Sequence, residues 1–278
     1  MTLLPWVLLG VVGLLIVAYV PKLQMRRLTR SREIPPVEAF KMENEIRKTV
    51  SQVVGGFAVL AGLVFTSQQF HLSQDVELAD RFIHGVEHLG DQSRSSAQGG
   101  ILSLQTVAAD SRKYSWQVMD SIAGYAQERS PAAHAEGNVQ DCFHMDWAGW
   151  DIQSAIDVIG QRTWGYDPPD WSPDLSDTNY RGVWFQKYRF DGAGFQRDRL
   201  ECADFTNAHL AGADFQEAHL EYAVLTGADL KRANMEGAFL TGANLKGADL
   251  SQVTGLTWEQ RQSAITDKQT RFPDRMKK

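Results

Sequence analysis

Large apolar residues recur at every fifth position over the last third of the chain. They are Phe185, Phe190, Phe195, Leu200, Phe205, Leu210, Phe215, Leu220, Leu225, Leu230, Met235, Leu240, Leu245 and Leu250. An unbroken series of alanines stands two residues before the later centres: Ala203, Ala208, Ala213, Ala218, Ala223, Ala228, Ala233, Ala238, Ala243 and Ala248. A period of five fits neither a helix nor a flat strand, so the backbone must turn once per repeat. Both positions are predicted to point inward, because only a small side chain fits beside a large one in a narrow core.

The repeat A(D/N)LXX, as in Ala228–Asp229–Leu230 and Ala243–Asn244–Leu245, resembles the pentapeptide-repeat family. This resemblance implies a right-handed quadrilateral β-helix with four repeats per coil, here over residues 171–253. Residues twenty apart should then stack at strand spacing, about 4.8 Å. Residues 254–278 are expected to form a C-terminal cap and tail, because an open β-helix exposes strand edges.

The start of the array is less regular, since Val183, Tyr188 and Asp198 replace the alanine. Asp198 at an inward position indicates either a distorted corner or a carboxylate that reaches solvent. Aromatic residues are dense over 143–195, which fits a protein-binding patch or, as the favoured interpretation, cover for the first coil. The candidate partner-binding residues are Tyr166, Trp171, Trp184 and Tyr188, and the loop 166–174 is expected to be exposed.

Two apolar stretches near the N-terminus predict a membrane hairpin over residues 1–70. Residues 3–20, LLPWVLLGVVGLLIVAYV, carry no charge and are long enough to cross the hydrocarbon core. A cleaved signal peptide is less consistent, because it requires a basic start and a shorter apolar stretch. The second stretch, residues 53–65, fits a helix that spans, dips into the membrane or packs in a protein core; spanning over 50–67 is favoured.

Lysines and arginines crowd the basic loop expected at 21–48, whereas Asp75, Glu77 and Asp80 follow the second stretch. The positive-inside rule predicts a cytoplasmic loop, which places the C-terminal part on the outer, periplasmic side. If the second stretch does not span, the soluble part is cytoplasmic instead.

Apolar residues at helical spacing predict helices over 76–89, 96–109, 114–127 and 151–161, which together form an α-helical adaptor over 75–165. The stretches at 81–90, 99–128 and 151–162 resemble the helical region of membrane-attached bacterial pentapeptide proteins. The resemblance therefore implies the bacterial inner membrane as the location. It implies no catalytic residues, and the protein is not expected to be an enzyme.

A net charge of −6 and a pI near 5.7 argue against a general nucleic-acid binder, so no nucleic-acid partner is expected. The two cysteines, Cys142 and Cys202, are far apart and indicate neither a disulfide framework nor a zinc motif, and the redox compartment stays open. Cys142 is interpreted as a partly buried thiol in a polar loop, and Cys202 as a face residue of the solenoid. No metal or cofactor is expected.

One short motif suggests chemistry. His84, Glu87 and His88 match HxxEH, the inverted zinc-peptidase motif, but no third ligand is indicated, so surface histidines are the favoured interpretation.

The leading function is a membrane-anchored scaffold whose partners are the lipid bilayer and an unidentified protein, in an inner-membrane complex or by self-association. The alternative, from resemblance to pentapeptide proteins that mimic DNA and protect topoisomerase, requires a strongly acidic face, which basic residues dilute here. A zinc peptidase is the remote alternative.

Overall fold

The structure is a computed structural model that describes residues 4–29, 35–134, 142 and 147–276. The chain divides into two compact units, Met1–Val76 and Glu77–Lys278. The helices are α1 (Leu4–Thr29), α2 (Pro36–Leu89), α3 (Arg94–Asp110), α4 (Ser115–Arg129), η1 (Ala132–His134), α5 (Trp150–Gly160), η2 (Trp164–Tyr166), α6 (Trp258–Ser263) and η3 (Asp274–Met276).

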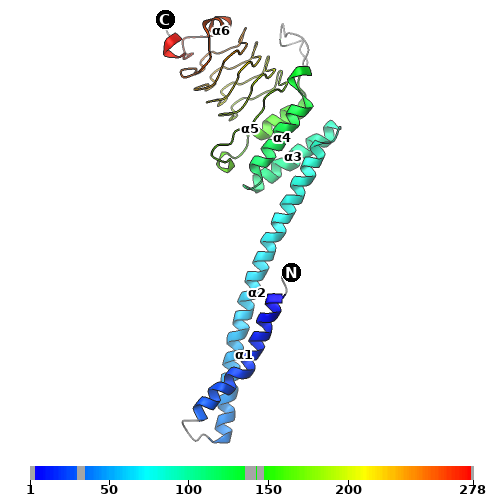
Figure 1. The fold of residues 1–278 in the computed structure, drawn as a ribbon, viewed down its shortest axis with the longest axis vertical. Helices are drawn as coiled ribbons and strands as arrows, with labels where there is room; N and C mark the ends of the chain where they lie inside the picture. Colours follow the sequence, from blue (N-terminus) through cyan, green and yellow to red (C-terminus); the bar gives the residue numbers. More distant parts are fainter. Residues whose placement is uncertain (1–3, 30–34, 135–141, 143–146, 277–278) are drawn as a thin grey trace. The chain divides into compact units, whose positions relative to one another are not determined.

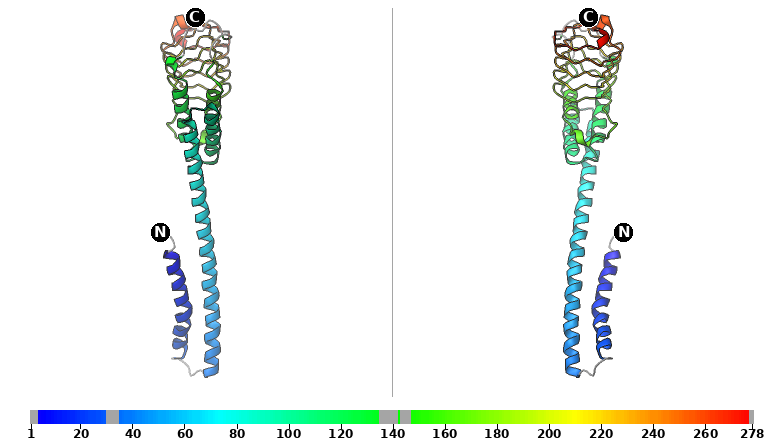
Figure 2. Two further views of the ribbon diagram at one scale, coloured as in Figure 1. Left: turned by 90° about the vertical axis from the view of Figure 1, so that its right-hand side faces the viewer. Right: turned by 90° about the vertical axis from the view of Figure 1, so that its left-hand side faces the viewer.

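In the first unit, α1 lies beside the first part of α2 (Figures 1 and 2). Gly13 permits a close approach, because a Cβ there would lie 3.2 Å from the Val54 side chain. Among the described residues, α2 is the one helix long and apolar enough to cross a membrane, judged by length and composition. The first predicted span begins outside the described residues, and the stretch Val11–Gln24 of α1 is apolar but shorter.

The helices of this region are longer than the sequence pattern indicates. Helices α1 and α2 extend over residues 22–29 and 36–48 of the expected basic loop, and the second predicted span and the helix expected over 76–89 belong to one helix of 54 residues, α2. Polar residues such as Gln52 and Gln68 flank the apolar stretch without interrupting the helix, because glutamine is a good helix former. Helix α2 begins at Pro36, and proline is favoured in the first turn of a helix.

In the second unit, the adaptor is built from the end of α2 with α3, α4 and α5. Its core is made of fully buried side chains: Ile101, Leu104, Val118, Ile122, Ile152 and Ile156. Gly85 of α2 and Gly100 of α3 let these helices cross closely, since a Cβ on Gly100 would lie 2.8 Å from the Gly85 carbonyl oxygen. The helices therefore share a single packed core with one another.

The repeats form a four-sided solenoid. Parallel bridges join residues twenty apart, from Asp174 with Gly194 to Asn234 with Thr254, as the sequence predicted. Each repeat makes a β-turn in which the alanine amide donates to the preceding centre's carbonyl, as Ala208 does to Phe205 at 2.9 Å. The turn's third residue has a positive φ, for example +58° at Arg197. Each side is so short that the described residues contain single bridges rather than extended strands.

The interior of the solenoid consists of the large and small positions picked out by the repeat. All fourteen predicted centres and all ten alanines are buried. The aromatic centres of the early coils stack in register: the Phe185 and Phe205 rings are 4.4 Å apart and nearly parallel, and Phe195 and Phe215 are 5.0 Å apart. The wider start is therefore filled by rings where later coils use leucine.

Where an aspartate or asparagine precedes the centre, its side chain closes the turn. Its side-chain oxygen accepts from the amide two residues on, as Asp204 does from Thr206 at 2.9 Å and Asp214 does from Gln216 at 3.1 Å. This is an Asx-turn, which explains why short acidic or amide side chains recur at this position.

The last coil is closed by α6 and the tail. Thr257 and Gln260 form a capping box at the start of α6. The Gln260 side chain also donates to the carbonyls of Met235 and Ala238, at 2.9 and 2.8 Å. The predicted cap is thus present, and it covers carbonyl groups that no further coil would reach.

Candidate functional site

The first coil is closed by side chains of the adaptor. In later coils each bridge residue pairs with the coil before it, but the first coil has none before it. At Trp184 the amide donates to Gln153 Oε1 at 2.8 Å, and the carbonyl accepts from Gln153 Nε2 at 2.9 Å. A glutamine side chain carries one donor and one acceptor group, so Gln153 on α5 reproduces the pairing of a neighbouring coil.

Two other sides of the first coil are closed in the same way. The Asn179 amide donates to the Ser130 carbonyl at 2.6 Å, and Ser130 Oγ donates to the Asn179 carbonyl at 3.1 Å. Arg162, next to the end of α5, donates to the Arg189 carbonyl at 2.8 Å. Because buried backbone groups require partners, these contacts fix the adaptor to the solenoid.

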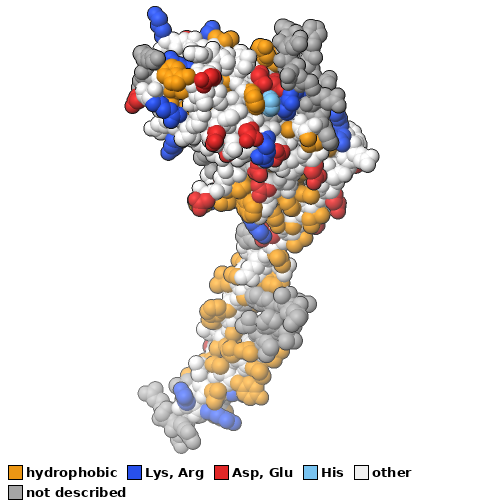
Figure 3. Space-filling view, turned by 45° about the horizontal axis from the view of Figure 1, so that its top comes forward, with side chains coloured by type: hydrophobic (Ala, Val, Ile, Leu, Met, Phe, Trp, Pro, Cys, Tyr) orange, Lys and Arg blue, Asp and Glu red, His pale blue; other side chains and the backbone are white. Residues whose placement is uncertain are grey.

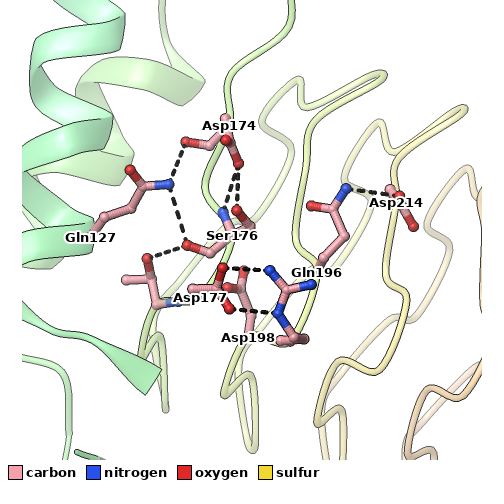
Figure 4. A network of polar contacts seen from close by, with 9 residues as sticks. Gln127, Asp174, Ser176, Asp177, Gln196, Asp198 and Asp214 are labelled. Carbon is pink, nitrogen blue, oxygen red and sulfur yellow. Dashed lines mark hydrogen bonds and ion pairs between the residues drawn. The ribbon is translucent and has the colours of Figure 1, made fainter. Parts of the chain in front are cut away.

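Helix α4 contacts the fourth side through Gln127 (Figure 4). Its Nε2 lies 3.4 and 3.3 Å from the carbonyl oxygens of Asp174 and Ser176. On the neighbouring turn, Arg197 donates two bonds to Asp177, at 2.7 and 2.6 Å, and these bonds lower the pKa of Asp177. The contact between α4 and the first coil is therefore polar on this side.

The loop 166–174, which was expected to be exposed, is held against the adaptor. Arg162 Nε donates to Asp167 at 2.9 Å with both side chains nearly buried, and its guanidinium lies 5.2 Å from the Trp171 ring. Trp171 Nε1 donates to Asp120 at 2.9 Å. Burial raises the pKa of Asp120, although the bond from Trp171 opposes this. The buried ion pair and the cation–π contact therefore hold the loop 166–174 in place, although its sequence had indicated a protruding segment.

The four predicted partner-binding residues do not form one patch. Trp171 and Tyr166 are half-buried in the loop just described. Tyr188 packs on Gly160, and its hydroxyl donates to Asp157 at 3.1 Å. Burial raises the pKa of this hydroxyl. Of the four, only Trp184 is exposed, whereas Trp171 and Tyr188 pack against the buried core, which is consistent with their interpretation as cover for the first coil.

Trp184 belongs to an aromatic cluster that was not singled out from the sequence. Its ring is 6.2 Å from that of Trp150, which is 4.6 Å from Trp147; both pairs meet edge to face. Trp150 is 64% exposed and Trp184 51%. The signal in the sequence was the WAGW spacing, which places two tryptophans three apart where α5 begins. We call Trp147, Trp150 and Trp184 the tryptophan cluster.

Asp198 occupies an alanine position and is completely buried, so the interpretation as a carboxylate that reaches solvent is wrong. Its Oδ1 accepts a hydrogen bond from the Thr178 amide at 2.9 Å. In the later repeats, the amide at the position of Thr178 donates instead to the carbonyl of the preceding centre. The Oδ2 of Asp198 has no hydrogen-bond partner among the described residues. Burial raises the pKa of Asp198 well above its usual value, and the nearby charges of Asp177 and Asp174 add to the effect.

We expect Asp198→Asn to change how stability depends on pH. Because folding raises this pKa, the wild-type group contributes stability that is full below its unfolded pKa and is lost as pH rises through the folded pKa. Asparagine keeps the acceptor for Thr178 but does not titrate. Urea unfolding at pH 4, 6 and 8 should show the variant gaining on the wild type as pH rises. A difference that stays constant across this range would contradict the assignment.

Cys142 and Cys202 form a disulfide, with their Cα atoms 5.6 Å apart and a separation of 60 positions in sequence. The interpretation of Cys142 as a partly buried thiol is wrong, because Cys142 is exposed and bonded. Cys202 is a face residue as predicted, at the positive-φ position of its turn. Spacing alone did not indicate the pair because only the coil brings position 202 to the adaptor side.

The HxxEH residues lie on the surface of α2 and bond locally. His84 Nδ1 is 3.1 Å from Glu87 Oε2, both side chains being well exposed, and His88 Nδ1 is 3.2 Å from Ser96 Oγ. Among the described residues, the group of side chains that could hold a metal ion lies elsewhere, on the solenoid.

Acidic and basic side chains are mixed on the face of the second unit shown in Figure 3. Lys231 forms an ion pair with Asp229 at 3.3 Å and lies 3.5 Å from Asp249. Asp249 also forms an ion pair with Arg271 at 3.3 Å. Several of the acidic groups that the repeat places outside are therefore neutralised by neighbours one coil or one turn away.

A family model named Pentapeptide repeats matches residues 199–237 and 223–254, in eight copies. Residues 199–254 are pentapeptide repeats. No curated protein matches the chain.

Several solved structures resemble the pentapeptide-repeat region. One is a pentapeptide repeat protein, Rfr23, from the cyanobacterium Cyanothece 51142, at 27% identity over 39% of this chain and 69% of that one, with a TM-score of 0.22. HetL, involved in heterocyst differentiation regulation in Nostoc sp. strain PCC 7120, is 30% identical over 36% and 51%, with a TM-score of 0.19. QnrB1, a plasmid-mediated fluoroquinolone resistance protein, is 24% identical over 36% and 50%, with a TM-score of 0.24. The chain thus spans about half the length of the last two.

Proposed function

We propose that this protein is a membrane-anchored scaffold of the bacterial inner membrane, with its pentapeptide-repeat solenoid on the periplasmic side, and that it binds another protein without catalysing a reaction. The observation that carries the proposal is the tryptophan cluster at the adaptor end of the solenoid. Tryptophan is enriched among residues that dominate binding energy at protein interfaces. The contacts around Gln153 and Arg162 hold this cluster on a fixed frame.

The apolar stretch of α2 supports the anchor. None of the residues in its apolar window is buried. Phe57, Leu60 and Leu63 are each at least 60% exposed. Such a surface is unfavourable in water but matches the hydrocarbon of a bilayer, where a helix satisfies its own backbone groups. Helix α1, beside it, completes a hairpin of two spans.

Two independent features support the periplasmic side. The basic residues cluster between the two apolar stretches, and the positive-inside rule assigns this part of the chain to the cytoplasm. The disulfide between Cys142 and Cys202 supports the periplasmic side for the soluble part, because disulfides persist in the periplasm and are rare in a reducing cytoplasm.

The two alternatives are less consistent with the described residues. DNA mimicry requires an uncompensated acidic face, whereas Asp177, Asp229 and Asp249 are paired with arginine or lysine. A zinc peptidase would require His84 and His88 to converge on one ion, whereas each has a different local partner.

A compartment reporter fused after Lys278 tests the membrane side. Alkaline phosphatase at this position should be active and a cytoplasm-dependent fluorescent protein dark. The reverse pattern would place the soluble part in the cytoplasm and overturn this half of the proposal.

Photo-crosslinking in native membranes tests the scaffold. A photoreactive phenylalanine at position 184 should capture a distinct protein, identified by mass spectrometry. The same group at position 222, where Tyr222 is exposed elsewhere on the solenoid, is the matched control. If position 184 crosslinks only to other copies of this protein, the proposal of a scaffold that binds a different protein is wrong.

A further inference from the structure

Three potential metal ligands meet on one face of the solenoid. The ligand atoms of Glu201, His219 and Glu221 lie within 4.8 Å of one another. Glu201 and Glu221 occupy the same position in successive coils, twenty residues apart, and His219 precedes Glu221 by two. The solenoid register alone brings them together.

The two carboxylates keep acceptor atoms that the protein does not use. Glu201 is buried, its side chain being 2% exposed, and its Oε1 accepts from Arg181 at 3.0 Å and Arg199 Nε at 2.8 Å. Neither Glu201 Oε2 nor Glu221 Oε2, both buried atoms, has a hydrogen-bond partner among the described residues. A buried carboxylate oxygen without a partner is costly, so this pair of atoms requires an explanation.

The ionisation state of Glu201 fits a cation ligand. Burial raises its pKa, but the bonds from Arg199 and Arg181 outweigh that effect, and the pKa lies below its usual value. The group is therefore an anion with one oxygen held by guanidinium groups and the other left over. Second-sphere bonds of this kind orient a metal ligand, although the arginine charges also weaken attraction for a cation.

The imidazole of His219 is held in place by two contacts. Its ring stacks on Phe239 at 4.4 Å, and its Nδ1 lies 3.2 Å from Glu221 Oε1. Ligands about 2.0–2.1 Å from a tetrahedral ion are roughly 3.3 Å apart, so this separation already suits two ligands of one ion.

We propose that Glu201, His219 and Glu221 bind a divalent first-row transition metal ion, with Zn²⁺ as the probe. One nitrogen and two carboxylate oxygens are ligands that Zn²⁺ accepts, and a water molecule would complete four-fold coordination. The ion would connect two successive coils beside the disulfide residue Cys202. It would neutralise the leftover carboxylate oxygens and strengthen the solenoid at the coils nearest the adaptor.

The test uses the full-length protein in detergent, with any affinity tag removed and metal stripped by a chelator. Titration with ZnCl₂ followed by desalting and elemental analysis should give about one equivalent per chain. His219→Ala and Glu221→Gln should each weaken binding at least about tenfold. Co²⁺ in place of Zn²⁺ should give visible d–d absorption that the same variants lose.

His209→Ala is the matched control, because His209 holds the same position in its repeat on another face and lies outside the group. It should bind zinc like the wild type, as should the His84→Ala/His88→Ala double variant. Circular dichroism checks that each variant is folded. Zinc retained in full by a folded His219→Ala, zinc lost only with the α2 histidines, or no zinc bound by the wild type would each overturn the proposal.

Discussion

Phe205→Ala should lower the free energy of unfolding by about 3–5 kcal/mol, the usual cost of removing a buried phenylalanine. Phe205 is fully buried, its ring stacks on Phe185, and it meets Phe195 and Phe215 edge to face. Truncation would leave a cavity bounded by three rings that the turns on either side prevent from collapsing. Urea unfolding of the detergent-solubilised protein measures the loss.

Phe205→Leu is the matched control for this site. Leu225 and Leu245 follow Phe205 in the same ladder, so leucine already fits this position in later coils. We expect leucine to cost less than about 1.5 kcal/mol, as for other swaps that nearly conserve volume. Equal losses for alanine and leucine would show that ring stacking, rather than filled volume, stabilises the early coils.

Cys202→Ser should lower the free energy of unfolding by about 4 kcal/mol under oxidising conditions. The bond closes a loop of 60 residues, and removing such a cross-link frees the unfolded chain by roughly this amount. Urea unfolding of the oxidised protein measures the change.

The same chain provides two controls for the disulfide. Cys142→Ser should lose as much as Cys202→Ser, because each removes the same bond. A reductant should bring the wild type down to the variants and leave the variants unchanged. Two free thiols in the unreduced, denatured wild type would contradict the bond, whatever the stability values.

The repeat could be predicted from sequence because its signal is local and periodic. The centres and alanines from Ala203 to Leu250 obey one rule, and the buried ladders follow from it. Helices α3, α4 and α5 were also predictable within a few residues, since Ile101, Ile122 and Ile152 fall on the apolar faces that the helical period defines.

The contacts between the adaptor and the first coil were not predictable, because they join residues that sequence spacing does not connect. Gln153 and Trp184 are 31 residues apart, and the glutamine acts as a substitute for a missing coil, a role that no motif records. The disulfide likewise depends on where the coil places Cys202. The tryptophan cluster was hidden among many aromatics, most of which serve as cover for the first coil.

The twenty-residue register of the bridges has a consequence for insertions and deletions. Removing five residues from the middle of the array would preserve every turn but rotate all later coils by a quarter turn relative to the adaptor. Faces that now continue from one coil to the next, such as the one shared by Glu201 and Glu221, would be divided. Removing twenty residues would instead shorten the solenoid by one coil and leave each remaining face aligned. The length of the array can therefore vary freely only in whole coils, while smaller changes would alter which surface points in which direction.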